Sequence, residues 1–540
     1  MMTKPYSGKN LRPMLLGGTA LLGGLLMSGA PAHAFSVYSN ASGTEISLDT
    51  TAEWSAMYRV NSPSAILTNN VNGNDGDLNF RHGIVDNTFD LLPVLDIKDG
   101  NYGAHVSGEF YLDTPYLGTT QNNSPATYNP YTTVNNRHFT SATRNINGQN
   151  AVLLDAFVYG STSFGSNDQQ TLTVKVGRQT LLWGQSLFFA TNGISAGQAP
   201  IDVIKAESLP NAQAQQIFLP VGQAVVTYQP NMTYTIQGFY QFEWEPDTFQ
   251  GVGAYFSSAD VLDKGGQRLI AGTNAYLYRT KDIRPPINNG EFGLSLQATY
   301  GNYDVGLYAE RFDAKAPSLY LTGPQPGQPG NSVGSYYLVY PRDIQLFGAA
   351  LSTTVGPVNV AGEISGRRNM PLVSGAAFTS TPVGPANAGA LYAKGSTMAA
   401  QASFIYVSPG LPLDPGGMTI DGEVAMNHVL SVDSGAAELT PHRNATGAAF
   451  DVVFTPTYYE VLPNLTVSLP IGFKYNFLGR SQIDATMNHG TGTINFGVTG
   501  TYRSVWTAGI TYQEYLGRPD PTLNPLADRG YVAFNLQRTF

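Results

Sequence analysis

Apolar and polar residues alternate along most of this chain with a period of two. Between Glu45 and Val60, the even positions carry mostly apolar residues such as Ile46, Leu48 and Trp54, while the odd positions carry mostly polar or charged ones. Because a β-strand places successive side chains on opposite faces, this alternation predicts a strand with one apolar face. Strands of soluble proteins typically stop after about 5–6 residues, so the longer pattern here indicates a tilted membrane crossing.

The same pattern recurs in about 18 segments, and they predict an all-β fold: a transmembrane, antiparallel, up-and-down β-barrel. About sixteen strands would result if one weak hairpin were loop instead. Either even number places both chain ends on the periplasmic side. The segments are 45–60, 82–98, 102–113, 150–160, 170–180, 221–229, 233–245, 291–300, 303–313, 342–354, 357–367, 396–408, 417–429, 448–460, 465–477, 490–502, 505–516 and 529–540.

Two kinds of connection alternate between these segments. Short turns, such as 98–101, 230–232 and 503–504, are separated by long or polar loops. Outer-membrane barrels show this asymmetry, with short turns in the periplasm and long loops outside. The longest connections are 114–149, 181–220, 246–290, 314–341 and 368–395.

Composition supports a barrel over a soluble or helical membrane protein. Charged residues make up 12% of the chain, about half of the roughly 25% that soluble domains carry. A mean hydropathy of -0.13 is too polar for a bundle of membrane helices. The absence of cysteine excludes disulfides, thiolate metal sites and lipid attachment to an N-terminal cysteine. The net charge of -9 argues against nucleic acid as a partner.

The first 34 residues have the pattern of a secretory signal peptide. A basic start is followed by an uncharged apolar stretch over 14–27, which is too short at ~1.5 Å per residue to cross a ~30 Å hydrocarbon core as an anchor helix. Small residues at 32–34 indicate a cleavage site that would make Phe35 the first mature residue. We therefore expect 1–34 to be removed after export through the inner membrane, leaving a single barrel domain over 35–540.

The final strand carries an assembly signal. Phe534, Leu536 and Phe540 share one face, and the sequence stops on the aromatic residue. This resembles the C-terminal signal recognised by the barrel-assembly machinery, and an exposed terminal strand can be captured by strand addition. We expect outer-membrane lipid and this machinery as partners, and we expect the strand to close the barrel against 45–60.

If the apolar parity faces lipid, the other parity faces the lumen, where acids outnumber bases. Neighbouring carboxylates repel one another, so either water fills the tube or loop bases such as Arg178 and Lys205 fold in to pair with them. Acidic walls favour cations, which predicts weak cation preference; a generically polar wall is the alternative. The lumen-facing acids are Glu45, Asp49, Glu53, Asp90, Glu109, Asp113, Asp155, Glu243, Asp304, Glu310, Glu363, Asp421, Glu423 and Asp451, against the bases Arg59, Lys175, Arg367 and Lys474.

The connection 181–220 has mixed charge and an amphiphilic end, and we expect it to fold inward and constrict the lumen. The alternative is a loop that lies over the mouth. A barrel of about 16–18 strands is wide enough to hold an inserted loop. The candidate lumen or constriction residues are Arg178, Trp183, Gln185, Asp202, Lys205 and Glu207 in this region, with Glu109, Asp155, Glu243 and Glu423 on the wall.

Four short motifs are distinctive: 75–80, 177–179, 183–188 and 200–202. They read DGDLNF, GRQ, WGQSLF and PID. Together they resemble a family of Gram-negative outer-membrane proteins known by a domain-of-unknown-function label, over essentially the whole mature chain. The resemblance implies an outer-membrane barrel that helps the uptake or export of hydrophobic compounds.

Residues 193–197 match the G-x-S-x-G pattern of a nucleophile elbow, with Ser195 as the candidate nucleophile. That elbow needs a tight strand-to-helix turn and downstream acid and histidine partners. Here the motif lies in a loop without the surrounding α/β pattern. We predict no catalysis and no cofactor, and an esterase or lipase using Ser195 is the enzyme alternative.

The segment 72–77 resembles a calcium-binding loop in composition. The helix-loop-helix calcium motif needs a glutamate at its twelfth position, which falls on Gly83 when the count starts at Asn72. The match therefore fails, and we predict no metal. Asp75 and Asp77 are the candidates for a looser external calcium site.

The pattern as a whole predicts a monomeric outer-membrane channel or transporter. Small molecules, hydrophobic ones among them, would pass by diffusion through a lumen restricted by a loop. One alternative is a structural or surface-interaction protein with a closed barrel, whose long loops bind a partner. The esterase using Ser195 is the other.

Overall fold

The computed structural model describes residues 35–540 except 41–42, 132–133, 167–168, 210–213, 263, 287–289, 381–389 and 409–415. The predicted signal peptide, 1–34, lies outside the described residues. Among the helices that are described, none is both long and apolar enough to cross a membrane.

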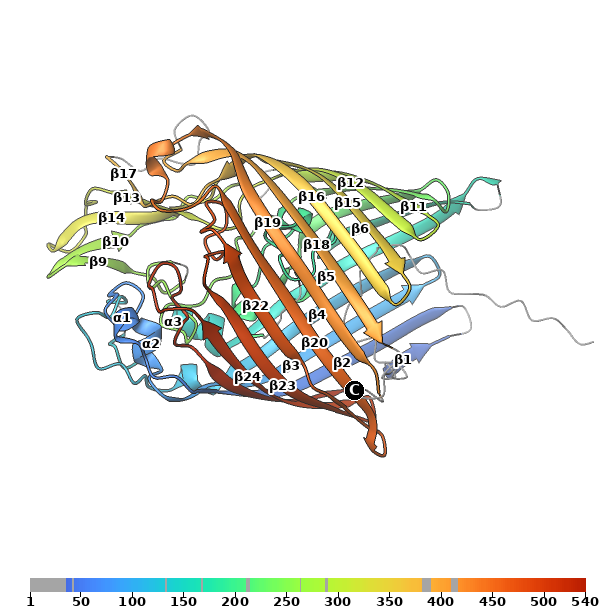
Figure 1. Ribbon diagram of the computed structural model, residues 1–540, viewed down its shortest axis with the longest axis horizontal. Coiled ribbons are helices and arrows are strands. Elements are labelled where there is room, and N and C mark those ends of the chain that lie inside the picture. The colour runs from blue at the N-terminus through green and yellow to red at the C-terminus, as the bar shows by residue number, and fades with distance from the viewer. Residues whose placement is uncertain are drawn as a thin grey trace, which may run out of the picture.

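Eighteen antiparallel strands form a closed barrel, as the alternating pattern predicted. Each strand pairs with the next along the chain, and the strands tilt across the barrel (Figure 1). The strands are β2 (Thr44–Arg59), β3 (Gly83–Asp99), β4 (Tyr102–Asp113), β5 (Gln149–Phe164), β6 (Gln170–Gln179), β7 (Val221–Gln229), β8 (Tyr234–Gln241), β11 (Glu291–Tyr300), β12 (Tyr303–Phe312), β15 (Ile344–Val355), β16 (Val358–Pro371), β18 (Lys394–Ser408), β19 (Met418–Ser434), β20 (Thr446–Leu462), β21 (Leu465–Ser468) with β22 (Ile471–Leu478), β23 (Gly492–Tyr502), β24 (Trp506–Leu516) and β25 (Tyr531–Thr539).

The crossing formed by β21 and β22 is one strand interrupted by a proline. Pro470 has no N–H to donate to the ladder, and a proline inside a sheet marks a break or an irregular position. The backbone nevertheless stays bonded on both sides, because Leu469 N donates to Pro456 O at 3.0 Å and Gly497 N donates to Pro470 O at 2.8 Å. A short extra strand, β1 (Phe35–Ser39), pairs with the start of β2.

The last strand closes the barrel against the first. β25 pairs antiparallel with β2 from Thr51 opposite Thr539 to Arg59 opposite Tyr531. The ladder continues to the final residue, whose N–H donates to Thr50 O at 2.9 Å. Closure therefore leaves neither terminal barrel strand with an unpaired edge, as expected from the sequence.

The outer wall of the barrel is apolar and the inner wall is polar. Leu294, Phe347 and Ile510 are all more than half exposed on the outside. On the opposite parity, side chains such as Glu423 and Asn495 are almost completely buried. This is the arrangement expected where one face of each strand meets lipid and the other meets the lumen.

Short turns join the strands at one end of the barrel, which we call the turn end, and long connections join them at the other, the loop end. Three long connections build a five-stranded sheet there (Figure 1). The sequence predicted these connections as loops, and four of the five strands have only three to five residues. They are β9 (Arg268–Gly272), β10 (Ala275–Arg279), β13 (Ser318–Thr322), β14 (Ser332–Val339) and β17 (Ala377–Thr379).

Several loops at this end carry short helices, and three of the connections share an aromatic core. The ring of Phe80 lies 5.4 Å from that of Tyr116 and 6.0 Å from that of Tyr255. These residues belong to three different connections, so their packing joins the loops into one body. The helices are α1 (Ala65–Thr68), α2 (Asp75–Asn79), η1 (Thr114–Leu117), α3 (Ser141–Thr143), η2 (Arg144–Gly148) and η5 (Ala436–Glu438).

Candidate functional site in the barrel lumen

The connection between β6 and β7 contains three short helices and makes most of its contacts with lumen-facing side chains. The helices are η4 (Ile194–Gly197), α4 (Val203–Ser208) and α5 (Ala214–Ile217). We call the residues 181–220, as far as they are described, the lumen segment. Its contacts with the wall are of three kinds: backbone N–H groups on carboxylates, aromatic packing, and one ion pair.

Glu423 of β19 holds the middle of the lumen segment. Its carboxylate accepts three consecutive backbone N–H groups, those of Leu187 at 3.1 Å, Phe188 at 2.5 Å and Phe189 at 3.0 Å. Hydrogen bonds to an ionised carboxylate are about twice as strong as neutral ones. Glu423 was a sequence candidate, and its parity on β19 explains why it lies on the inner face of the strand.

Glu363 of β16 is a second carboxylate anchor. It accepts from Gln185 N at 2.5 Å and from Ile194 N at 2.8 Å, so it binds both ends of the turn that Glu423 holds. Four residues further along β16, the Arg367 guanidinium donates to Asn192 O at 2.7 Å. The wall thus satisfies both donors and acceptors of the segment backbone, which would otherwise be buried without partners.

Trp183 and Gln198 attach the lumen segment to β8 and β12, on the arc of strands that precedes β16. The indole N–H of Trp183 donates to Gln237 Oε1 at 2.6 Å, and its ring packs on Phe239 with centroids 5.1 Å apart. Gln198 Nε2 donates to Glu310 Oε1 at 2.9 Å. Sequence parity had placed Glu310 in the lumen, but nothing in the sequence singled out Gln198 as the partner of Glu310 or Gln237 as the partner of Trp183.

The helix α4 brings three sequence candidates together. Asp202 is its N-cap and accepts from Lys205 N at 3.0 Å. The Lys205 ammonium forms an ion pair with Glu109 of β4 at 3.2 Å. Glu207 accepts from Gln250 Nε2 at 3.0 Å. A basic residue of the loop thus folds in and pairs with a wall carboxylate. This is one of the two arrangements that the sequence left open, the other being a tube filled with water.

Arg178 and Glu243 meet each other but lie away from these contacts. Arg178 ends β6 next to the lumen segment, and its guanidinium pairs with Glu243 Oε1 at 2.9 Å. Glu243 follows the end of β8 and also accepts from Gly222 N at 2.5 Å. Asp155, the remaining wall candidate, lies on β5 and accepts from Ser107 Oγ at 3.3 Å.

The wall formed by β2, β3 and β4 is rich in carboxylates. Glu53 of β2 lies directly across the ladder from Asp90 of β3. Asp86 also belongs to this wall, where it accepts from Ser55 Oγ at 3.2 Å; the sequence candidates did not include it. Because Lys205 reaches this wall from α4, it adds positive charge to an acidic surface.

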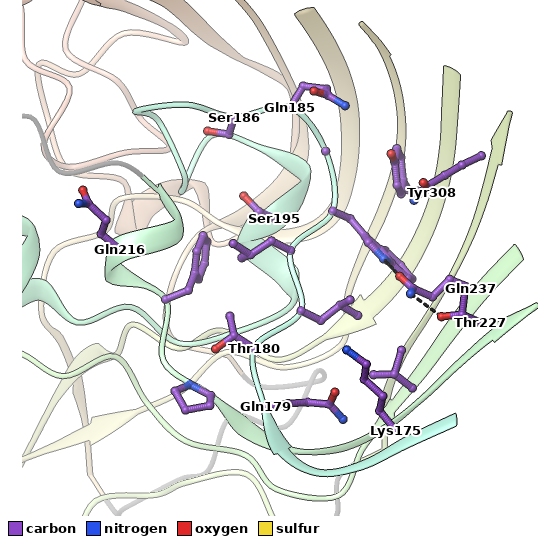
Figure 2. Close-up of a pocket in the computed structure, with 18 of the residues that line it drawn as sticks. Lys175, Gln179, Thr180, Gln185, Ser186, Ser195, Gln216, Thr227, Gln237 and Tyr308 are labelled. Atoms are coloured by element: carbon purple, nitrogen blue, oxygen red, sulfur yellow. Dashed lines mark hydrogen bonds between the residues drawn. The ribbon is translucent and has the colours of Figure 1, made fainter. Parts of the chain in front are cut away.

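A cavity of about 710 Å³ lies beside the lumen segment. Figure 2 shows the lining, to which the barrel strands contribute polar groups such as Gln237, Thr227 and Lys175. The segment contributes apolar side chains, including Trp183 and Phe218. The segment also contributes polar side chains such as Gln185 and Ser186, and the strands contribute apolar ones such as Val225, so both kinds are mixed around the cavity. Its size falls in the range of about 300–1,000 Å³ that holds drug-sized ligands.

Ser195 sits in the short 3-10 helix η4, not in the strand-to-helix turn of a nucleophile elbow. Its side chain is buried, and its hydroxyl donates to Ala190 O at 3.4 Å. The two glycines of the motif pack on carboxylates of the wall. A Cβ on Gly193 would lie 2.8 Å from Glu363 Oε1, and one on Gly197 would lie 2.3 Å from Glu310 Oε2. Close packing accounts for both glycines.

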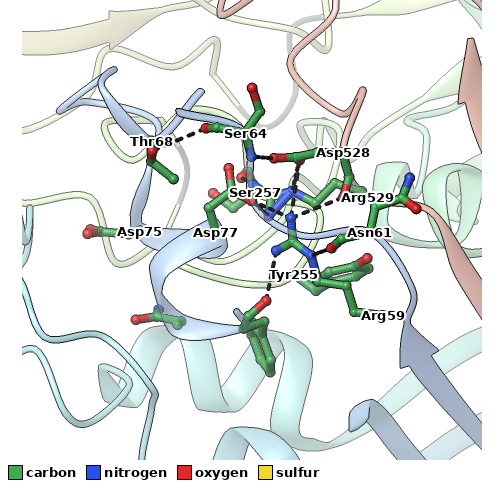
Figure 3. A network of polar contacts seen from close by, with 12 residues as sticks. Arg59, Asn61, Ser64, Thr68, Asp75, Asp77, Tyr255, Ser257, Asp528 and Arg529 are labelled. Carbon is green, nitrogen blue, oxygen red and sulfur yellow. Dashed lines mark hydrogen bonds and ion pairs between the residues drawn. The ribbon is translucent and has the colours of Figure 1, made fainter. Parts of the chain in front are cut away.

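The two calcium candidates lie in different surroundings at the loop end. Asp77 pairs with two guanidinium groups, Arg59 at 2.8 Å and Arg529 at 2.9 Å. Asp528 completes the cluster, 3.3 Å from Arg59 (Figure 3). Asp77 is therefore neutralised by arginine. Asp75 lies apart from these guanidinium groups in the same view.

The three residues of the assembly signal lie on the outer face of β25. The Phe534 ring packs against Trp54 of β2, with centroids 5.2 Å apart. Leu536 lies across the ladder from Trp54, and Phe540 is half exposed. The Arg538 guanidinium covers the Phe540 ring at 4.3 Å. Recognition by the assembly machinery stays a prediction.

Comparison with solved structures finds barrels of similar length. The BenF-like porin from Pseudomonas fluorescens Pf-5 is 10% identical, with 92% of this chain and 98% of that chain covered and a TM-score of 0.42. OccAB2 of Acinetobacter baumannii is 10% identical, with 92% of this chain and 98% of that chain covered and a TM-score of 0.43. The outer membrane channel DcaP of the same species is 10% identical, with 93% of this chain and 99% of that chain covered and a TM-score of 0.36. TM-scores this low support no conclusion about the present chain.

Among curated proteins, no match is found. One family model, described as "Protein of unknown function (DUF1302)", matches residues 15–540. That match covers nearly the whole chain and agrees with the resemblance carried by the four short motifs. The chain belongs to the DUF1302 family.

Proposed function

We propose that this protein is an outer-membrane channel through which small molecules diffuse, and that the lumen segment narrows its passage. One observation carries the proposal. The segment binds carboxylates on four strands spaced around the ring: Glu109 on β4, Glu310 on β12, Glu363 on β16 and Glu423 on β19. A segment attached at these four points must cross the lumen, so solutes pass only beside it.

The wall supports a location in a membrane. A closed barrel satisfies every strand edge, which is one of the two ways a chain can span a bilayer. Its exposed apolar exterior would be costly in water but matches hydrocarbon. Barrels of this kind belong to outer membranes, and in that setting the loop end faces outward and the turn end faces the periplasm.

The cavity beside the segment supports an amphiphilic cargo. Its apolar side chains, such as Trp183 and Phe218, can cover a hydrophobic surface. Its polar side chains, such as Thr227 and Gln237, offer hydroxyl and amide groups that can replace water around a polar edge. A hydrophobic molecule with a polar edge therefore finds partners of both kinds in this lining.

Single-channel recording in planar bilayers tests the channel. We expect a small conductance for the natural protein and a severalfold larger one for the double variant Glu363→Ala, Glu423→Ala, because its segment loses five backbone hydrogen-bond attachments. The variant Asp433→Asn is the matched control, since this carboxylate is exposed near the end of β19. No conductance from either the natural or the double-variant protein would favour a closed barrel with a structural role.

The cargo class is tested in cells. A deletion strain should grow more slowly than its parent on lipids, steroids or aromatics as carbon source, and the natural gene should restore growth. Equal growth on the entire panel would contradict a role in hydrophobic uptake while leaving the conductance result intact.

A further inference from the structure

Asp75 and Asp260 form a second acidic site at the loop end, separate from the cluster of Arg59 and Asp77. Both side chains are completely buried. Asp260 Oδ2 accepts from Asp75 N at 3.0 Å, and Asp75 Oδ2 accepts from Asn129 N at 3.0 Å. In the described part of the chain, neither carboxylate has a basic side chain within ion-pair distance. Two buried acids thus lie together without a paired cation.

The polar atoms around them that lack partners are almost all oxygens. Asp75 Oδ1 and Asp260 Oδ1 have no hydrogen-bond partner among the described residues, and the same holds for Oδ1 of Asn74, Asn79 and Asn129. All five side chains belong to residues at most 2% exposed. Buried polar atoms in native proteins are normally satisfied, so this concentration of free acceptors calls for an explanation.

The three amides cannot simply be turned round to remove these free oxygens. Asn74 Nδ2 donates to Thr68 O at 2.8 Å, and Asn79 Nδ2 donates to Gly253 O at 2.9 Å. Asn129 Nδ2 donates to Arg268 O at 3.1 Å. Each acceptor is a backbone carbonyl, which fixes the nitrogen on that side and the oxygen on the other. The three amide oxygens are therefore true acceptors. The side chain of Asn122 lies beside the Asp75 carboxylate, and its Nδ2 likewise lacks a partner among the described residues. This one donor leaves the other four oxygens without a partner, and a cation would satisfy them.

We propose that Asp75 and Asp260 bind a divalent cation, with calcium preferred. Oxygen atoms of carboxylates and amides are the ligands that calcium takes, in a flexible arrangement of about 6–8. Asn79 and Asn129 are sources of amide oxygen at this site: Asn79 lies one helical turn after Asp75, and the backbone N–H of Asn129 already donates to Asp75. Magnesium binds less well because it requires near-ideal octahedral geometry.

Two charged ligands set a modest affinity. Among the described residues there is no group of three or more His, Cys, Asp or Glu side chains that could hold a metal. The site thus combines two carboxylates with neutral oxygens, and external calcium modules with few charges bind at about 0.1–1 mM. Such an affinity suits a site filled from the medium.

A proton is the competing occupant. Burial and then the charge of Asp260 raise the pKa of Asp75 well above its usual range. Burial also raises the pKa of Asp260 to about 7. One proton shared by the two carboxylates would cancel one charge but leave the amide oxygens unsatisfied. A cation would both neutralise the carboxylates and satisfy the amide oxygens.

The site would connect three loops. Asp75 belongs to α2, Asn129 to the connection between β4 and β5, and Asp260 to the connection between β8 and β11. A cation shared by these residues would hold the loop end together, so its removal should loosen loops that contact the rim of the channel. This role is independent of the proposed passage of solutes.

The test uses the full mature chain, refolded in detergent so that calcium carried by lipopolysaccharide does not contribute. Equilibrium dialysis against calcium chloride, followed by elemental analysis, should give one calcium per chain with a Kd of about 0.1–1 mM. The Tm should be higher in 10 mM calcium than in EDTA, and magnesium at the same concentration should give a smaller shift. Asp75→Asn and Asp260→Asn should each weaken binding at least tenfold, while Asp433→Asn binds as the natural chain does.

Three results would overturn the proposal. One is an identical Tm of the natural chain in calcium and in EDTA, and another is unchanged calcium binding in both asparagine variants. The third is higher stability of those variants with no response to calcium, which would assign the site to a shared proton. If the variants fail to fold, the dialysis stoichiometry of the natural chain still decides.

Discussion

Lys205 in α4 and Glu109 on β4 form an ion pair, with Nζ and Oε2 3.2 Å apart, that attaches the lumen segment almost directly across the ring of strands from its anchor on β19. Both side chains are partly buried. The pair thus supports the second half of the segment, which the carboxylates of β16 and β19 do not reach.

Breaking this pair should loosen α4 without unfolding the barrel. We expect Lys205→Met and Glu109→Gln each to raise single-channel current noise. In a double-mutant cycle of thermal stability, the two should couple by about 1 kcal/mol, because partly exposed pairs are screened by water. The pair of Arg279 with Asp282 in the loop-end sheet serves as a control that should change stability but not current. Purely additive effects, with unchanged noise, would show that the pair does not hold the segment.

The buried arginine cluster should dominate the stability of the loop end. Arg59 donates to Phe80 O at 2.7 Å as well as pairing with Asp77 and Asp528. Arg59→Met would leave buried carboxylates with fewer partners, and removing one member of a buried pair typically costs about 3–5 kcal/mol. Limited proteolysis should therefore cut the loops much faster in this variant. Arg518→Met, at an exposed arginine, should be cut at the natural rate.

The acidic wall of β2, β3 and β4 should make the passage prefer cations. The reversal potential in a potassium chloride gradient should show potassium more permeant than chloride, since acidic pore walls attract cations. Replacing Glu53 and Asp90 together with glutamine should bring the ratio of potassium to chloride permeability closer to one. Anion preference in the natural protein would refute the assignment of these side chains to the conducting lumen. Asp433→Asn should leave the ratio unchanged.

The loop residue Asp247 should make stability fall as pH rises from about 4 to 6. Its carboxylate accepts from Ile201 N at 2.7 Å, and burial raises its pKa to about 6. The folded chain therefore keeps a proton that the unfolded chain releases near pH 4, so stability is fully present below that pH and declines until both forms are ionised. Asp247→Asn, which keeps the acceptor oxygen, should flatten the Tm profile in this window. An unchanged profile in this variant would contradict the assignment to Asp247.

The strand pattern was sufficient to predict the barrel. Because one parity must face lipid along each strand, residues such as Leu294 and Ile510 reveal both the strand and its orientation. The closing pair of β25 with β2 followed from the even number of strands. Strands such as β9 and β13 at the loop end were missed because five residues give too little alternation to separate them from loop sequence.

The lumen could be predicted only in part. Parity correctly places Glu109, Glu310 and Glu423 on the inner wall, since position on a strand decides which way a side chain points. Parity gives no information on how far along the barrel axis a side chain lies, so it could not predict which acids contact the lumen segment. Partners such as Gln198 and the backbone N–H groups of 187–189 carry no signal in the sequence, because amides and peptide groups bind wherever the fold presents them.

The spacing of Gly193 and Gly197 matches the distance between two wall carboxylates. The absence of a side chain at Gly193 leaves room for the carboxylate of β16, and the same absence at Gly197 leaves room for that of β12. The 3-10 turn between the two glycines sets the distance between them. Inserting or deleting one residue there would move one glycine off its carboxylate and bring a side chain into its place. Ser195, between the two glycines, has no part in these contacts. A search for hydrolases by this motif will therefore also return barrels that have no nucleophile elbow.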